Sequence, residues 1–355
     1  MRLLYLLAIV FYPLAKASEQ KTNIDLLETT MKNAVVTNQK EDRNCYAHSA
    51  YHMLNAYFHK NGVLPESIKL SPESLLATSY HDREKFITIH GRTCDQIENF
   101  KNNGSCEDQA TLELLADILG DDETEFEGAR KRLSSRLKRR SSRFFKDQAC
   151  KTALTETLDQ YSLGEVNPFI VDMRNIIRRN KDFSYRLFTN YLEEKCRGRN
   201  EWIYVSQEKI PQCERFAYKE VDEDNSKRMR LREPKEFIAR IDKVISNGQP
   251  AGIAFCAEIL RSDYEKPYIK NRDFPIDILE MQEYDFSKNY HEDCLYHASV
   301  ITGRKVVNGK QYYGILNSWG PRTHTDAKHV ILENGIYWIE QSILQDNIYK
   351  VYNLK

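Results

Sequence analysis

One amphipathic stretch decides much of the fold of this chain: Cys45-Tyr46-Ala47-His48-Ser49-Ala50-Tyr51-His52-Met53-Leu54-Asn55-Ala56-Tyr57-Phe58. Its apolar residues recur at spacings of three and four, which is the period of a helix with one buried face. Asn44 or Asp42 can cap the start of this helix, and Gly62 and Pro65 end it after Lys60. The stretch therefore predicts a packed helix that begins at a cysteine.

The rest of the chain divides into a helical front and a strand-rich back. Further helices are expected from Ser71-Pro72 and over 111–119, and another over Lys235–Asn247. Strand-like runs follow at 251–256, 297–303, 312–316 and 335–339. Because Asn308-Gly309 is a strong hairpin signal, the back should be antiparallel. The sequence predicts an α+β fold of two lobes with a cleft between them.

The predicted organisation has four parts. Residues 1–17 form a signal peptide, 18–120 a helical lobe, 121–233 a charged and mainly helical insertion, and 234–355 a β-rich lobe. The start carries the apolar run Leu3–Ala15 and then Ala15-Lys16-Ala17, which is typical of a secretory signal removed at about Ala17. A membrane anchor is the alternative, but the run is short for a span of roughly 20 residues. No later stretch is apolar enough to cross a bilayer, so we expect an exported protein, secreted or periplasmic.

Composition excludes some partners. The 355 residues contain 52 Lys and Arg against 52 Asp and Glu, which disfavours nucleic-acid binding and a polybasic membrane surface. Within the insertion, acidic residues 121–123 precede a basic stretch over 130–143. This stretch is either a solvated helix face paired with those acids, or a docking surface for a protein inhibitor or other partner.

Eight cysteines in an exported chain suggest disulfide bonds. We favour pairs between Cys256 and Cys294 and between Cys196 and Cys213. No two cysteines form a CxxC, so a structural zinc site has little support. His324 and His329 flank Asp326, but this pattern alone does not indicate a metal, and neither metal nor cofactor is expected.

The expected chemistry begins with Cys45. A thiol in the first turn of a helix feels the positive end of the helix dipole, which favours the thiolate. His297 opens an apolar strand, and Asn317 follows 20 residues later, where its oxygen could hold the second ring nitrogen of the imidazole. Gln39 could join the backbone N–H of Cys45 in an oxyanion hole. Trp319 could shield the His–Asn hydrogen bond from water.

These motifs resemble the papain and cathepsin family of cysteine peptidases. The resemblance is carried by the order Gln39, Cys45-Tyr46-Ala47, His297-Ala298 and Asn317-Ser318-Trp319-Gly320. It implies a papain-like fold with a helical left and a β-barrel-like right domain. It also implies Cys45 as nucleophile, His297 as general acid/base, Asn317 as orienting partner, Gln39 as oxyanion donor and Trp319 as shield, acting on polypeptide substrates.

The sequence also departs from that family. The residues before the cysteine read Asp42-Arg43-Asn44, so the family's first disulfide is absent. Only about 20 residues separate the signal from Gln39, which leaves no room for the family's inhibitory pro-region.

Two other functions stay open. A cysteine-dependent acyltransferase or cell-wall amidase would share the Cys–His pair. A catalytically idle papain-like binding module would keep the fold and bind a partner through the insertion.

Overall fold

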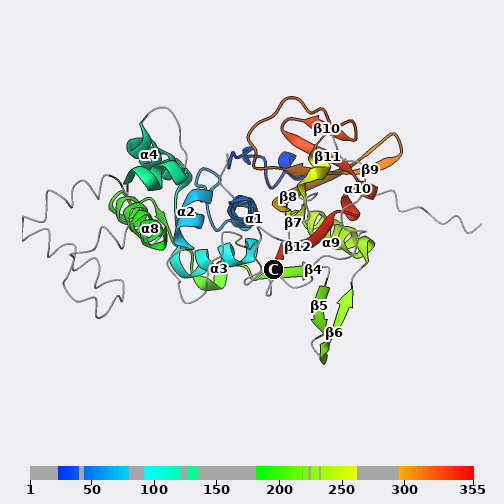
Figure 1. Cartoon of the computed structure of the whole chain (residues 1–355), viewed down its shortest axis with the longest axis horizontal. Coiled ribbons are helices and arrows are strands. Elements are labelled where there is room, and N and C mark those ends of the chain that lie inside the picture. The colour runs from blue at the N-terminus through cyan, green and yellow to red at the C-terminus, as the bar shows by residue number, and fades with distance from the viewer. Residues whose placement is uncertain are drawn as a thin grey trace, which may run out of the picture.

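The computed structural model describes residues 23–39, 44–79, 92–120, 126–133, 135, 181–217, 219–222, 225–231, 233–261 and 296–355. Helix α1 (Cys45–Lys60) lies in the middle of the molecule, with a group of helices on one side and a sheet on the other (Figure 1). The predicted helix over this stretch is confirmed. Asn44 occupies its N-cap position, although its side chain makes no capping hydrogen bond.

Several helices and a short ribbon lie on one side of α1. They are α2 (Pro72–Thr78), α3 (Thr93–Asn103), α4 (Asp108–Leu119) and α8 (Lys181–Gly198), with the paired strands β2 (Ser105–Cys106) and β3 (Trp202–Ile203). Helix α2 begins as its sequence predicts, because the Ser71 side chain accepts from Ser74 N–H and Pro72 occupies the first turn.

The other side is a sheet in which every pair of neighbouring strands is antiparallel. Its order is β10-β11-β9-β8-β7-β12-β4, and β1 pairs with β8. The strands are β1 (Ile24–Asp25), β4 (Cys213–Ala217), β7 (Ala251–Cys256), β8 (Tyr296–Val307), β9 (Lys310–Leu316), β10 (Val330–Glu333), β11 (Ile336–Glu340) and β12 (Ile348–Leu354). The predicted α+β class, helical in front and antiparallel behind, is confirmed.

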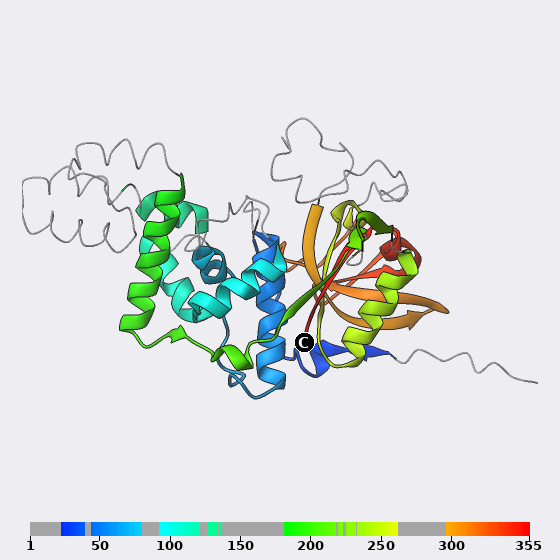
Figure 2. The same ribbon diagram turned by 90° about the horizontal axis from the view of Figure 1, so that it is seen from below.

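Several further elements are described outside these two groups. Helix α9 (Pro234–Ser246) lies beside the sheet in both views (Figure 2), and its Glu233 and Glu236 form a capping box. The others are α10 (Gln341–Gln345), the hairpin of β5 (Lys219–Asp222) and β6 (Asn225–Leu231), and the 3-10 turns η1 (Leu26–Glu28), η3 (Gln207–Lys209) and η4 (Ala257–Leu260).

The turn between β8 and β9 is the hairpin that its sequence predicts. Asn308 and Gly309 have φ values of 50° and 77°, the positive pair that a type I′ turn requires. Asn334 and Gly335 do the same between β10 and β11, with φ values of 51° and 79°. The first of these turns fixes the register of β8 against β9.

Helix α1 packs directly on the sheet. The Ser49 hydroxyl donates to the backbone oxygen of Ser299 over 3.1 Å, and both residues are buried. A Cβ at Gly252 in β7 would lie 2.5 Å from the Met53 sulfur, so a larger residue here would require the Met53 side chain or the helix to shift. The first residues of α1 therefore lie against the middle strands of the sheet.

Two disulfides join distant segments. Cys94 of α3 is bonded to Cys213 of β4, and Cys106 of β2 to Cys196 of α8. The predicted pairing of Cys196 with Cys213 is therefore wrong. The two cysteines are only 17 positions apart in sequence, but each has a neighbour from another element, which spacing could not reveal. Cys256 is also disulfide-bonded, while its predicted partner Cys294 lies outside the described residues.

Much of the predicted insertion lies outside the described residues, among them 121–125 and 136–180. Where the basic stretch is described, Arg130 is buried and forms an ion pair with Glu127, which Lys131 also approaches at 3.7 Å. The docking role of the insertion stays a prediction. In the described part of the chain, no helix has both the length and the apolar character needed to span a bilayer.

Candidate active site

Cys45 is the first residue of α1 and is partly buried. It is also the free thiol among the described cysteines, since Cys94, Cys106, Cys196, Cys213 and Cys256 are all in disulfides. An unpaired cysteine among bridged ones is available for chemistry.

The Cys45 sulfur lies against the start of β8. The backbone N–H groups of Ala298, Tyr46 and Cys45 itself act on the sulfur in the direction that favours the thiolate. Burial outweighs them and raises the pKa of the thiol to about 11. Because Ala298 directly follows His297, the first turn of α1 lies beside the part of β8 that carries the imidazole.

His297 is held by Asn317. The Nε2 atom of the imidazole lies 2.5 Å from Oδ1 of Asn317, and both side chains are buried. The strand register explains the contact. β8 and β9 run antiparallel with Val300 opposite Leu316, so the start of β8 meets the residue that follows β9. Since Nε2 donates to the amide oxygen, Nδ1 is the ring nitrogen that can exchange a proton.

The surroundings of His297 are apolar. Its ring lies 5.7 Å from Phe255 and 5.0 Å from Trp319, measured between ring centroids. Burial lowers the pKa of His297 to about 4, although the hydrogen bond to Asn317 works in the opposite direction. The imidazole is therefore neutral at neutral pH.

Trp319 lies beside the histidine. Its ring is tilted by 37° to that of His297, and the Arg322 guanidinium lies 5.7 Å from the indole on which it packs. Asn38 forms an isolated β-bridge with Trp319. The indole is thus fixed between the histidine and a cation.

Gln39 reaches the same place through the chain just before it. Its backbone N–H donates to the oxygen of Ser318 over 2.7 Å, and the Ser318 hydroxyl donates to its side-chain oxygen over 2.5 Å. This leaves the amide nitrogen as the donating end of the Gln39 side chain. Gln39 and Asn317 are therefore coupled through Ser318, whose own N–H donates to Oδ1 of Asn317 over 2.8 Å.

Two residues of this site had no predicted role. Ser318 positions Gln39, and Phe255 packs on the imidazole from β7, where the register places it opposite His297. Ser318 stands inside the Asn-Ser-Trp-Gly motif but its partner is 279 positions away in sequence, and nothing local marks it. Phe255 could have been found only from strand order.

Two other histidines have partners of their own. His324 forms an exposed pair with Asp326 at 2.8 Å, and His329 binds the backbone oxygen of Ile259 at 2.7 Å. Among the described residues, no three His, Cys, Asp or Glu side chains are grouped as metal ligands would be.

No protein-family model and no curated protein matches this sequence. Among solved structures, PepW from Lactobacillus rhamnosis HN001 has a TM-score of 0.40 at 13% identity, covering 94% of this chain and 81% of that one. Digestive procathepsin L 3 of the Tenebrio molitor larval midgut gives 0.42 at 9%, covering 97% and 73%. Procathepsin B S9 from Trypanosoma congolense also gives 0.42 at 9%, covering 94% and 77%. Because these TM-scores are below 0.5, the similarities do not support a function for this chain. Only the contacts within the chain can support one.

Proposed function

We propose that this protein is a cysteine peptidase that hydrolyses peptide bonds through a thioester on Cys45. One observation carries the proposal. The free thiol at the start of α1 lies against the residue after His297, and the far nitrogen of that imidazole is held by Asn317. A nucleophile, a base and an orienting group in this relation are what acyl transfer needs.

In the proposed mechanism, Nδ1 of His297 takes the thiol proton as the Cys45 sulfur attacks the carbonyl carbon of the substrate. The backbone N–H of Cys45 and the amide N–H of Gln39 stabilise the oxyanion that forms. The imidazolium then returns the proton to the leaving amine as the C–N bond breaks, which leaves a thioester. Water, deprotonated by Nδ1, attacks the thioester, and the acid and the thiol are released.

Asn317 and Trp319 act indirectly in this mechanism. The Oδ1 atom of Asn317 accepts a hydrogen bond from Nε2–H, which keeps Nδ1 unprotonated and aimed at the thiol. Trp319 packs over the imidazole, and its ring would keep water from competing for that hydrogen bond. Export of the protein is part of the proposal and is supported by the signal-like start of the chain and by the disulfides.

The direct test is turnover of a broad peptide library by the wild type and by Cys45→Ala. We expect the variant to lose activity, and to lose labelling by an epoxide-type thiol inhibitor, while it keeps its fold by circular dichroism. A second pair compares His297→Gln with His329→Gln. Only the first should abolish turnover, because His329 bonds a backbone oxygen away from the thiol.

The contrary outcomes are equally definite. Turnover of peptidoglycan fragments with none of peptides would replace the peptidase with the amidase. Tight peptide binding with no turnover of either substrate class would indicate an idle binding module.

A further inference from the structure

His48 is a buried titratable group that the proposed mechanism does not use. It lies one turn after Cys45 on α1 and is only 1% exposed. Among the described residues, neither of its ring nitrogens finds a hydrogen-bond partner. Unmade hydrogen bonds at this depth cost free energy, and an apolar side chain of similar size would avoid that cost. What distinguishes the imidazole from such a side chain is that it can take up a proton.

His48 belongs to a buried polar stripe on α1. Asn44, His48, His52 and Asn55 follow one another at spacings of four, four and three, so they lie along one face of the helix. Each is buried and has a polar atom without a partner among the described residues. The stripe begins next to the thiol of Cys45 and contains two histidines one turn apart.

The surroundings of these histidines oppose protonation. Burial, and next the imidazoles of His52 on the same helix and His297 on β8, lower the pKa of His48 to about 3. Burial and then Lys69 lower the pKa of His52 to about 3 as well. Both rings are therefore neutral in the folded protein at pH 5 and above.

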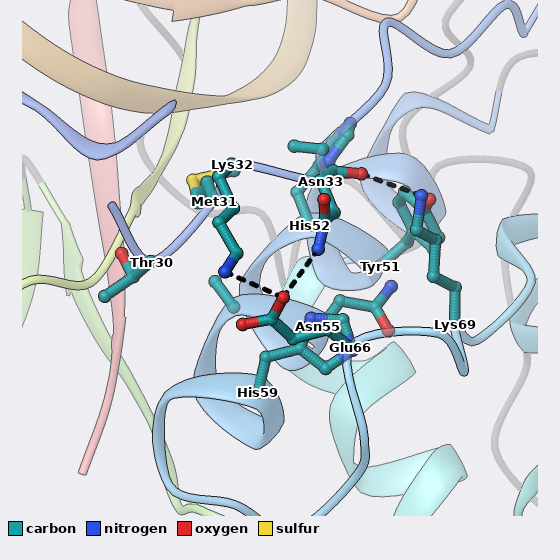
Figure 3. A pocket seen from close by; sticks show the side chains of 12 residues that line it. Thr30, Met31, Lys32, Asn33, Tyr51, His52, Asn55, His59, Glu66 and Lys69 are labelled. Atoms are coloured by element: carbon teal, nitrogen blue, oxygen red, sulfur yellow. Dashed lines mark hydrogen bonds and ion pairs between the residues drawn. The ribbon is translucent and has the colours of Figure 1, made fainter. Parts of the chain in front are cut away.

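The carboxylate nearest the far end of the stripe is engaged elsewhere. His52 and Asn55 line a cavity together with residues 30–34 and the loop that carries Glu66 and Lys69 (Figure 3). The Glu66 carboxylate is paired with Lys32 at 2.9 Å and accepts from Asn33 over 3.0 Å (Figure 3). It is therefore not bonded to either histidine of the stripe.

The elements packed around α1 present other titratable groups, and these act elsewhere. From α2 and α4, Glu73 and Asp108 act on the hydroxyl of Tyr51, and Asp95 of α3 acts on a tyrosine of β12. β8 and β12 add Tyr296, Tyr349, Lys350 and Tyr352. In the part of the chain that the structure describes, no carboxylate is among the groups that act on His48. A protonated His48 would therefore meet no opposite charge.

His48 lies at the contact that brings the candidate site together. Ser49, the next residue, donates to the backbone oxygen of Ser299 in β8, and Cys45 lies one turn earlier beside Ala298 of the same strand. A charge on His48 would be buried within this contact unless the contact opened. Because burial of an unpaired charge is expensive, protonation favours states in which the helix has left the strand.

We propose that His48 makes the packing of α1 against β8 sensitive to acid. In mild acid the unfolded chain takes up a proton that the packed imidazole refuses, so acid favours separation of the helix that carries Cys45 from the strand that carries His297. The candidate site would be intact in neutral surroundings and dismantled in acidic ones. This acid sensitivity belongs to the fold and does not require turnover.

The direction and range of the effect follow from two pKa values. An unfolded histidine takes up a proton near its ordinary pKa of 6.5, whereas folded His48 does so only near pH 3. Between these values the unfolded state binds more protons, so stability is complete above about pH 6.5 and is lost as the pH falls toward 3. Between pH 7.5 and pH 5, His48 alone should raise the unfolding equilibrium constant roughly 30-fold.

The test is urea unfolding of the purified protein, with its disulfides intact, at pH 7.5 and at pH 5, followed by circular dichroism. For each variant the unfolding constant at pH 5 is divided by that at pH 7.5, so that the contribution of the shared carboxylates cancels between variants. His48→Met and His48→Gln cannot take up the proton, and their ratio should be roughly 30-fold smaller than that of the wild type. The glutamine keeps a polar side chain, which separates the loss of the proton from a change of polarity.

His324→Met is the matched control, because His324 is exposed and can be charged without leaving water. Its ratio should stay within about threefold of the wild type. In the wild type, NMR of the histidine rings should show His48 neutral in the folded protein at pH 5, and this measurement decides the matter where neither His48 variant folds.

Two results would overturn the proposal. One is a ratio for His48→Met and His48→Gln equal to that of the wild type, and the other is a His48 ring that titrates near pH 6.5 in the folded protein. Absence of peptidase activity would count against the role of Cys45 instead and would leave these ratios unchanged.

Discussion

Oδ1 of Asn317 lies 2.5 Å from Nε2 of His297, and the pair is enclosed by Phe255 and Trp319. An apolar enclosure makes a single hydrogen bond decide how the ring is oriented and which nitrogen carries the proton. This relation carries the first prediction.

Asn317→Ala should lower kcat by roughly ten- to a hundredfold, because the imidazole loses its orientation while its chemistry remains. KM should change little, since Asn317 is buried and bonds the imidazole rather than substrate. Steady-state kinetics on one peptide substrate would measure both constants. A fall in kcat/KM that comes from KM alone would contradict the proposed role.

The ionisation of the pair gives a second prediction. Burial holds the thiol of Cys45 with a pKa of about 11 and His297 with a pKa of about 4, so between these values both are neutral. Only the thiolate reacts with iodoacetamide. As long as the pH is below the pKa, the thiolate fraction rises roughly tenfold for each unit by which the pH is raised.

The alkylation rate of Cys45 should therefore climb steadily from about pH 6 to about pH 9, with no plateau in between. Mass spectrometry of the modified peptide follows the rate. A constant rate across this range would mean that a thiolate–imidazolium pair exists before substrate binds.

Local patterns predicted those parts of the fold whose causes are local. Apolar residues at helical spacing located α1, and Asn308-Gly309 located the β8–β9 hairpin, since a type I′ turn needs positive φ at both positions. Cys45 and His297 could be proposed as site residues because each lies at the start of a helix or strand that the sequence indicates.

The disulfide prediction that was wrong, and the contacts that were not predicted, depend on segments that are distant in sequence. The Cys94–Cys213 bond spans 119 positions, and only the packing of α3 beside β4 brings its sulfurs together. Ser318 meets Gln39 across 279 positions. The cavity beside His52 and Asn55 is lined by α1, by residues 30–34 and by the loop with Glu66 and Lys69. A helical pattern in the sequence indicates only the first of these segments.

Gln39 supplies a third prediction. If its amide N–H stabilises the oxyanion, Gln39→Ala should lower kcat by roughly 10²- to 10³-fold with little change in KM. Gln311→Ala is the control, because Gln311 lies in β9 and its amide donates to the backbone oxygen of Lys305 over 3.1 Å, away from the thiol. Equal kinetics for the two variants would remove Gln39 from the mechanism.

The disulfides give a fourth prediction. Replacing Cys94 and Cys213 together by serine should lower the free energy of unfolding by roughly 5 kcal/mol in the chain-entropy model. The Cys106–Cys196 bond closes a loop of similar length, with a separation of 90, and should cost nearly as much. Urea unfolding of both double variants makes the comparison. A loss below about 1 kcal/mol for either would mean that packing alone holds those segments together.

The last prediction concerns the approach of α1 to β7. A Cβ at Gly252 would lie 2.5 Å from the Met53 sulfur and 3.1 Å from Cβ of Tyr352. Gly252→Ala should therefore push the helix away from the sheet and lower the free energy of unfolding by about 1 to 3 kcal/mol. Because the same helix carries Cys45 toward Ala298, kcat should fall as well.

Met53→Ala provides the complementary change, since it removes the sulfur that the new methyl group meets. Alone it should cost about 2 to 5 kcal/mol, because Met53 is fully buried. The double variant should be more stable than the sum of the two losses predicts, and should recover part of kcat. A double-mutant cycle by urea unfolding measures this coupling. Strict additivity would show that Gly252 is not what sets the distance between α1 and the sheet.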